Sequence, residues 1–364
     1  MMYNEIYMLW LSTLVPHFGS RKINDLLGRF ASAKEIFTAS YERLRREGGL
    51  TPVALATLTR NRNLENIEKS LHELQQRQIV YISREHKAFP MLLTAIADPP
   101  VGIFYMGELP PDNLHKVSII GSRKCSEYGL MTARALAAPL ARRGVVIVSG
   151  MARGVDSMAH KGALEGNGKT MAVLGCGVDV CYPAEAHALR KAIIKNGCVL
   201  SEYPPGTKPH KAYFPARNRL ISGLSHAVVV VEAGRRSGTL ITVDTAQDQG
   251  REVLAVPGNV SSKLSEGTNR LIRDGAIPVI DYTDVLFTLG LSQEAEPVSG
   301  TRENIVLAPE EKQVYDTLNL AAVPFDAILA RTGLDAGQAH LICIALELKQ
   351  LIKKLPGARY IRNM

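Results

Sequence analysis

A series of short apolar runs, alternating with stretches suited to helices, constrains the fold of this chain more than any other feature. Segments such as Leu130–Arg143 and Leu240–Gln249 separate the runs. Continuous apolar strands alternating with helices predict βαβ units and a parallel sheet that is buried on both faces. We therefore expect an α/β fold with a Rossmann-like parallel sheet core. The predicted strands are Val117–Ile120, Val145–Val148, Met171–Leu174, Val199–Leu200, Ala227–Val231, Val253–Val256 and Ile277–Ile280.

Changes in composition divide the chain into four predicted parts. Residues 1–80 carry apolar side chains at helical spacing, punctuated by proline and glycine, and predict a helical N-terminal domain. Residues 85–290 contain the apolar runs and predict the Rossmann-like domain. Residues 291–305 are mostly polar and predict a linker. Residues 306–364 predict three helices and a hairpin, which is the order of a winged-helix-like C-terminal domain.

Two segments near these boundaries need separate interpretation. Leu14–Lys22 could form a helix-hairpin-helix-like turn that grips a DNA backbone, or a small helical module for packing or protein binding; we favour the second. The segment from Phe89 to Pro100 is expected to be a rigid extended connector, because proline disfavours helix at the residue before it.

Charge and cysteine usage narrow the class of partner. The net charge of +8 over 364 residues favours an anionic partner, although charge governs association more than fold. Residues 306–364 hold seven Lys or Arg against six Asp or Glu, which is weak for a reader of duplex DNA, so protein contact is at least as well supported there. The five cysteines form no C-x-x-C pair, and no apolar run is long enough to span a membrane. These features predict a cytoplasmic protein without membrane association.

Glycine-rich loops follow four of the predicted strands. In a doubly wound sheet, ligands bind beyond the carboxyl ends of the strands. Glycine lets the backbone approach a ligand closely, and the first amides of a helix offer partial positive charge to an anion. Four such loops at one rim predict a phosphate-binding site. They are Gly121-Ser122-Arg123, Ser149–Asp156, Gly175–Gly177 and Glu232–Thr239.

Two segments resemble nucleotide-binding motifs only in part. Gly175–Val180 lacks the third glycine of a dinucleotide fingerprint. Ala163–Thr170 has alanine at the first glycine of a P-loop and precedes a strand, so its amides would not line a phosphate cradle. We expect no nucleotide cofactor and no bound metal.

The stretch Tyr203–Val231 combines cations with aromatic rings. It contains four lysine or arginine residues and no acidic residue. The four are Lys208, Lys211, Arg217 and Arg219. Grooves for single-stranded nucleic acid need both kinds of side chain, because cations follow the phosphates and aromatic faces stack on the bases. Phe214 could fill such a role or pack in the core.

Four acidic or histidine side chains could suggest catalysis. Asp156 and His160 are one helical turn apart, and Glu202 and Glu232 each follow a strand. No nucleophile or third metal ligand stands near them in sequence. We therefore interpret them as structural groups that cap helices or pair with Arg217 or Arg219.

At these residues the sequence resembles the DprA/Smf family, DNA-processing protein A. The likeness covers about residues 85–290 in the order and spacing of the family, whereas the flanks match a sterile-alpha-motif-like domain and a winged helix in style only. The motifs that carry it are Asp98–Pro100, Ile119–Arg123, Ser149–Asp156, Ala159–Ala163, Phe214–Leu224, Ser237–Thr242, Gly250-Arg251 and Ala255–Gly258.

The resemblance implies a recombination mediator that binds and protects single-stranded DNA. It also implies that the protein forms a homodimer through the Rossmann-like domain and loads RecA recombinase during natural transformation. The residues expected to bind DNA are Ser122, Arg123, Gly150, Arg153, Gly154, Lys211, Phe214, Arg217, Asn218, Arg219, Ser237 and Gly238.

The alternative is a nucleotide sensor or a phosphoribohydrolase-like enzyme of the same fold superfamily. Such enzymes carry a pair of glutamates after a Gly-Gly-x-Gly-Thr loop, whereas Leu240 and Ile241 follow Gly238-Thr239 here. Hydrolysis through an oxocarbenium-like transition state without a placed carboxylate would be unusual. We therefore expect a protein that is not an enzyme and has no catalytic residues.

Overall fold

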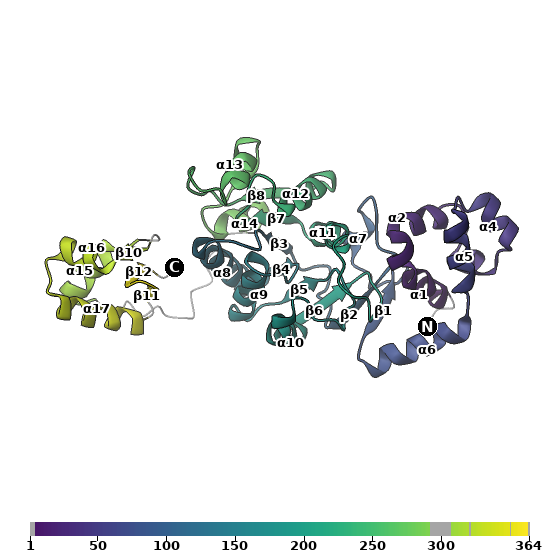
Figure 1. The fold of residues 1–364 in the computed structure, drawn as a ribbon, viewed down its shortest axis with the longest axis horizontal. Helices are drawn as coiled ribbons and strands as arrows, with labels where there is room; N and C mark the ends of the chain where they lie inside the picture. Colours follow the sequence, from purple (N-terminus) through teal and green to yellow (C-terminus); the bar gives the residue numbers. More distant parts are fainter. Residues whose placement is uncertain (1–3, 292–306, 320–321, 350, 363–364) are drawn as a thin grey trace. The chain divides into compact units, whose positions relative to one another are not determined.

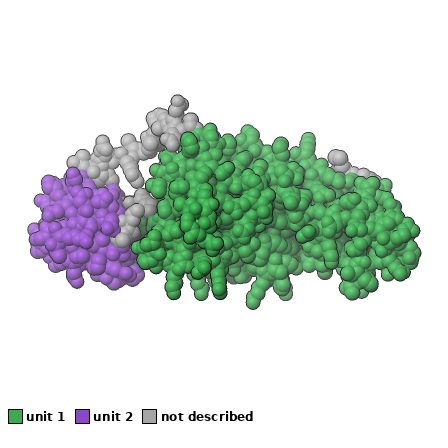
Figure 2. Space-filling model, turned by 90° about the horizontal axis from the view of Figure 1, so that it is seen from above, with its two compact units in different colours: residues 1–292 green, residues 293–364 purple. Residues whose placement is uncertain are grey.

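The structure is a computed structural model that describes residues 4–291, 307–319, 322–349 and 351–362. The chain divides into two compact units, residues 1–292 and 293–364 (Figure 2). The helical region and the sheet therefore share the first unit. Apart from Leu291, the predicted linker lies outside the described residues.

A nine-stranded sheet forms the centre of the first unit (Figure 1). Each of the seven predicted apolar runs forms a strand, and β3 to β9 pair in parallel in the order β6-β5-β4-β3-β7-β8-β9. The six adjacent strands β5-β4-β3-β7-β8-β9 follow the Rossmann order, and β6 extends the sheet beyond β5. The strands are β3 (Lys116–Ile120), β4 (Val146–Ser149), β5 (Thr170–Val173), β6 (Gly197–Ser201), β7 (Ala227–Val230), β8 (Glu252–Ala255) and β9 (Ile277–Pro278).

Helices cover both faces of this sheet, because alternate strand residues are apolar toward each face. Val117 and Ile119 pack with α8, α9 and α14 on one face, whereas Ile120 and Val228 pack with α7, α11 and α12 on the other. The predicted buried parallel sheet is confirmed. The helices are α7 (Met91–Thr94), α8 (Glu127–Arg142), α9 (Val155–Glu165), α10 (His187–Asn196), α11 (Tyr213–Gly223), α12 (Gly238–Asp248), α13 (Glu266–Arg273) and α14 (Tyr282–Thr288), with a 3-10 turn at Ala184–Ala186.

Two further strands, β1 (Val80–Ser83) and β2 (Gly102–Gly107), extend the sheet beyond β6: β2 pairs antiparallel with β6, and β1 pairs antiparallel with β2. The sequence interpretation missed both: β1 is short and has one exposed end, and the apolar run Ile103–Met106 of β2 was not assigned as a strand. The expected extended connector between them is partly wrong, since it contains α7. A proline ring does not clash with the residues that follow it in the chain. Pro90 can therefore precede a helix that begins at Met91.

The N-terminal helices share a core with this antiparallel edge. Trp10 and Leu14 pack in one cluster with Tyr81 and Phe104 of β1 and β2. Gly19, with φ of +72°, breaks α2 into two parts, as only glycine adopts this conformation readily. The helices are α1 (Glu5–Thr13), α2 (Val15–Leu27), α3 (Ala33–Thr38), α4 (Tyr41–Glu47), α5 (Pro52–Arg60) and α6 (Leu64–Gln76).

The second unit is a winged helix, as predicted. Its three helices enclose Val314, Ile328 and Cys343, and an antiparallel hairpin packs Tyr360 against them. Two apolar side chains of α17, Leu341 and Ile344, remain exposed. The elements are α15 (Pro309–Thr317), β10 (Val323–Pro324), α16 (Phe325–Thr332), α17 (Ala336–Leu348), β11 (Ile352–Leu355) and β12 (Arg359–Arg362).

None of the described helices is both long and apolar enough to cross a membrane.

Candidate nucleic-acid interface

The predicted glycine loops enclose two adjoining cavities at the carboxyl ends of β3, β4, β5 and β7. The chain leaves β3 toward one edge of the sheet and returns at β7 to build the other, so this is the topological switch point where such folds bind ligands. The larger cavity has a volume of about 710 Å³ and the smaller one about 60 Å³. Both are lined by Arg123, Ala152, Tyr182, Phe214 and Arg217, and we call them together the rim cavity.

The loops contribute most of the predicted site residues to this rim cavity. The larger part is lined by Ser122, Arg123, Lys211, Phe214, Arg217, Asn218, Ser237 and Gly238, and the smaller part adds Gly150 and Arg153. Residues distant in sequence thus meet at one place.

Arg123 and Phe214 form the centre of the rim cavity. The guanidinium carbon of Arg123 lies 5.1 Å from the centroid of the Phe214 ring, which is within cation–π range. The Tyr182 ring lies 5.3 Å from Phe214, and the exposed Lys211 lines the same cavity. The predicted mixture of cations and aromatic faces therefore exists in space. Phe214 faces this cavity from the start of α11.

Tyr213, the neighbour of Phe214, faces the opposite way. Its ring stacks on Tyr203 with centroids 4.3 Å apart, and its hydroxyl lies 3.4 Å from the carbonyl oxygen of Pro16 in α2. Tyr213 thus connects α11 to the N-terminal helices and takes no part in lining either cavity.

Arg217 is buried beneath the rim cavity and forms part of its floor. It donates hydrogen bonds to the carbonyl oxygens of Gly150, at 2.9 Å, and of Val173. A Cβ atom on Gly150 would lie 2.6 Å from the guanidinium, so glycine is required for this contact. Burial lowers the pKa of Arg217 to about 10, which leaves it charged at neutral pH.

Asp156 and Gly154 fix the loop that follows β4. The buried Asp156 carboxylate accepts hydrogen bonds from the amides of Gly150, at 3.2 Å, and Ala152, at 3.4 Å. Burial raises the pKa of Asp156, and the positive charge of Arg217 opposes this rise. Gly154 has φ of +78°, and a Cβ there would lie 2.4 Å from the Ser122 carbonyl oxygen. Gly154 therefore joins two loops, although it does not line a cavity itself.

The first turn of α12 closes the rim cavity on the side of β7. Ser237 caps this helix by accepting the Thr239 amide at 3.2 Å. Gly238, Thr239 and Thr242 also line the cavity. The partial positive charge of a helix N-terminus here favours an anion.

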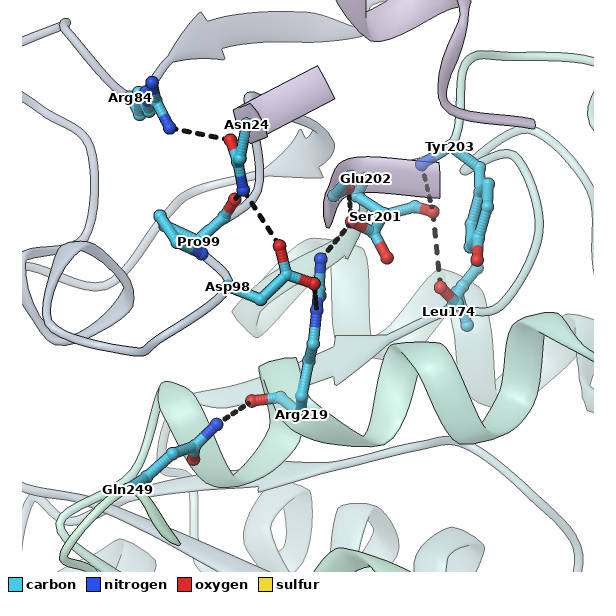
Figure 3. A network of polar contacts seen from close by, with 11 residues as sticks. Asn24, Arg84, Asp98, Pro99, Leu174, Ser201, Glu202, Tyr203, Arg219 and Gln249 are labelled. Carbon is cyan, nitrogen blue, oxygen red and sulfur yellow. Dashed lines mark hydrogen bonds and ion pairs between the residues drawn. The ribbon is translucent and has the colours of Figure 1, made fainter. Parts of the chain in front are cut away.

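Two predicted DNA-binding arginines are held by carboxylates instead. Arg153 is exposed at the rim and forms an ion pair with Glu185. Arg219 lines neither cavity: it donates to Glu202 at 2.6 Å and to Asp98 at 3.2 Å, on the side of α11 that faces the N-terminal helices (Figure 3). The expectation that Arg219 completes the basic pocket is therefore corrected.

The acidic and histidine side chains have structural partners, as predicted. Glu232 accepts hydrogen bonds from the amide and hydroxyl of Ser126 at the N-cap of α8. His160 is fully buried and its Nδ1 lies 2.7 Å from Thr170 Oγ1. Burial lowers the pKa of His160 to about 3, so it stays neutral. Among the described residues, no three His, Cys, Asp or Glu side chains are grouped to hold a metal.

Sequence interpretation missed several lining residues. Tyr182 comes from the long loop after β5, and Lys124, Thr239, Ile241 and Thr242 complete the wall. An aromatic residue following the Gly175–Gly177 loop was the available signal for Tyr182. Nothing in the sequence indicated that this loop folds back toward α11.

Comparison with known proteins agrees with this geometry. Residues 80–290 match the family model described as DNA recombination-mediator protein A. The chain belongs to this family. Residues 293–358 match the winged-helix domain described for DprA. The resemblance to the DprA/Smf family is thus confirmed, and the chain is a member of a family of DNA-processing recombination mediators.

Individual relatives show how far the likeness extends. Protein Smf of Synechocystis is 33% identical over 337 residues, covering 83% of this chain and 85% of its own length. Protein Smf of Escherichia coli is 36% identical over 306 residues, covering 82% and 81%. The crystal structure of DprA from Streptococcus pneumoniae has a TM-score of 0.67 at 35% identity, covering 79% of this chain and 98% of that one.

A second solved structure concerns single-stranded DNA directly. It is DNA processing protein A from Helicobacter pylori, described for its unique mode of binding single-stranded DNA. It has a TM-score of 0.52 at 32% identity and covers 58% of this chain and 95% of that one.

Proposed function

We propose that this protein captures single-stranded DNA in the rim cavity, without catalytic turnover. The observation that carries the proposal is the Arg123 guanidinium over the Phe214 ring, with Lys211 on the same wall. Cations bind phosphates of any sequence, and an aromatic face accepts any base. The binding of single-stranded DNA by the Helicobacter pylori relative supports the same assignment.

A single strand suits this site better than a duplex. A base can stack on Phe214 only if its own face is accessible, and stacking inside a duplex occupies both faces. The rim cavity is also recessed among loops, so a flexible backbone reaches Arg123 and Lys211 more readily than a stiff helix does.

The proposal includes the cellular role that the family resemblance implies. In it, the protein is a cytoplasmic homodimer formed through the Rossmann-like domain. It protects incoming single strands and loads RecA recombinase onto them during natural transformation. Retention of a strand by contacts with backbone and bases suits such a transfer, because these contacts need no particular sequence.

The contacts around the rim cavity favour binding over hydrolysis. Asp156 is the carboxylate among the described lining residues, and the amides of Gly150 and Ala152 already occupy it. Ile241 and Thr242 line the cavity where the phosphoribohydrolase pattern has glutamates. A carboxylate held in this way is poorly placed to stabilise an oxocarbenium-like transition state.

The central test compares a labelled oligo-dT with a matched duplex at several salt concentrations. We expect tighter binding of the single strand, and a slope of log affinity against log salt near −0.7 for each phosphate contacted. Equal affinity for both DNA forms, or no dependence on salt, would contradict the proposal. Incubation with nucleoside monophosphates serves as the enzymatic arm, in which release of free base would show the alternative activity.

A further inference from the structure

The N-terminal hairpin lies at the same rim of the sheet as the proposed DNA site. We define the N-terminal hairpin as residues 16–22, around the break at Gly19. Ser20 donates a 2.6 Å hydrogen bond to Glu202, which directly follows β6. The Pro16 carbonyl oxygen lies 3.4 Å from the hydroxyl of Tyr213 at the start of α11. Both contacts are at the carboxyl ends of the parallel strands, where the rim cavity opens.

A buried network holds the hairpin in this position. Glu202 is bound at once by Ser20 of α2 and by Arg219 of α11, and Asp98 is bound by Asn24 and Arg219 (Figure 3). Arg84 completes the group by donating to Asn24 at 2.8 Å. Because Glu202 is largely buried, displacing α2 would take the Ser20 hydroxyl from it and Asn24 from Asp98, and buried acceptors would lose hydrogen bonds. The hairpin is therefore a fixed part of this rim.

The surface between the rim cavity and the hairpin carries cations. No Asp or Glu occurs between Glu5 and Asp25, or between Glu202 and Glu232, and these two acid-free segments meet at the contact of Pro16 with Tyr213. Asp179 is the acidic side chain that approaches this loop, through the Gly206 amide, and Arg77 pairs with it at 3.1 Å. The exposed basic side chains of the two segments are His17, Arg21, Lys22, Lys208, His210 and Lys211.

We propose that Arg21 and Lys22 of the N-terminal hairpin extend the DNA-binding surface, so that a long single strand runs from the rim cavity over Lys211 and Lys208 onto the hairpin. This inference rests on the proposed function of the rim cavity. Positive charge continues across two segments that contact each other, and such a surface favours binding of a polyanion. The loop between the rim cavity and the hairpin adds further cations. The packing role of Ser20 and Asn24 uses one side of α2 and leaves Arg21 and Lys22 exposed on another.

The test uses the full chain and two lengths of labelled oligo-dT, about six and about 20 nucleotides, since single-strand sites span such lengths. The double variant Arg21→Gln and Lys22→Gln should bind the long oligonucleotide several-fold more weakly. Its salt slope should be shallower by about 1.4, or about 0.7 for each lost contact. Binding of the short oligonucleotide, which the rim cavity accommodates alone, should be unchanged.

The matched control is the double variant Arg60→Gln and Lys69→Gln, which removes two exposed charges of the same helical region from α5 and α6. It should bind both lengths as the unaltered protein does. Unchanged binding of the long oligonucleotide by the hairpin variant would overturn the inference, as would an equal loss for both lengths. If the unaltered protein bound neither oligonucleotide, the proposed function itself would fail.

Discussion

The two sides of α11 use arginine in different ways. Arg217 points beneath the rim cavity and bonds to backbone carbonyl oxygens, with Asp156 near enough to influence its pKa. Arg219, two residues further on, points toward the N-terminal helices and binds two carboxylates, Glu202 and Asp98. Both arginines stand in the same acid-free segment. Their different roles come from partners that distant segments supply.

This difference teaches that a basic segment is not uniformly available to an anion. On the cavity side, Arg123 and Lys211 have no carboxylate partner among the described ion pairs. On the side of α11 that faces the N-terminal helices, which we call the junction side, the charge of Arg219 is neutralised by carboxylates of the protein itself. Predictions about the two sides should therefore differ in kind: loss of stability on one side and loss of DNA binding on the other.

The largest expected effect is on the junction side. Arg219→Ala should lower the free energy of unfolding of the first unit by about 3–5 kcal/mol, because Glu202 remains buried without its cation. Urea denaturation followed by circular dichroism measures the loss. Arg153→Ala is the matched control, since it breaks an exposed pair and should cost at most about 1 kcal/mol. Similar small losses for both variants would remove the proposed contrast.

A second prediction concerns His160, whose pKa is lowered by burial and, to a smaller extent, by the charge of Arg217. The folded pKa of about 3 lies below the ordinary value of 6.5, so below pH 6.5 the unfolded chain binds a proton that the folded chain does not. Stability should therefore fall as the pH decreases, by about 2 kcal/mol at pH 5 from this group.

Urea titrations at pH 7.5 and 5 on the unaltered chain and His160→Gln check this prediction. The variant should lose most of that pH dependence, whatever its stability at neutral pH. His72→Gln, at an exposed position on α6, should retain it. An unchanged difference between the two pH values in the His160 variant would contradict the assignment of a neutral buried histidine.

The smallest expected effect is on the cavity side. Arg123→Ala and Lys211→Ala should each weaken oligo-dT binding by about fivefold at 0.1 M salt, equally for all sequences, because each removes one phosphate contact. Fluorescence anisotropy measures the affinities. Lys195→Ala is a suitable control, because this exposed side chain lies just before β6 at the opposite rim. Full affinity in both cavity variants would show that the DNA site lies elsewhere.

The sequence allowed the fold to be predicted wherever its signal was local. The inner parallel strands are buried on both faces, so their apolar runs identify them. The strands β1 and β2 pack against the helical region and become partly exposed at one end, so their pattern was weaker. The break at Gly19 and the short helix α7 both depend on local backbone geometry. The glycine itself signals the break, whereas no residue of α7 signals that helix.

The rim cavity could also be predicted only in part, where the signal lay in the local sequence and the strand order. Strand order places the loops after β3, β4 and β7 at one rim, so Ser122, Arg123, Gly150 and Ser237 could be assigned to one site. The fate of Arg153 and Arg219 could not, because Glu185 and Glu202 approach them from other segments of the chain. Side-chain direction along α11 depends on which helix packs against each side.

The contact between Arg123 and Phe214 has a consequence for ligand selection. The guanidinium lies over the ring, so each group already has the other as a partner. A lone phosphate that draws Arg123 away leaves the ring facing water, and a lone base must displace the cation without offering it a new partner. A nucleic acid strand provides a phosphate for the cation and a base for the ring in one exchange. Under the proposed function, the pair would therefore favour a ligand that carries a phosphate and a base together over a free phosphate or a free base, because the rearrangement is compensated only when both arrive together.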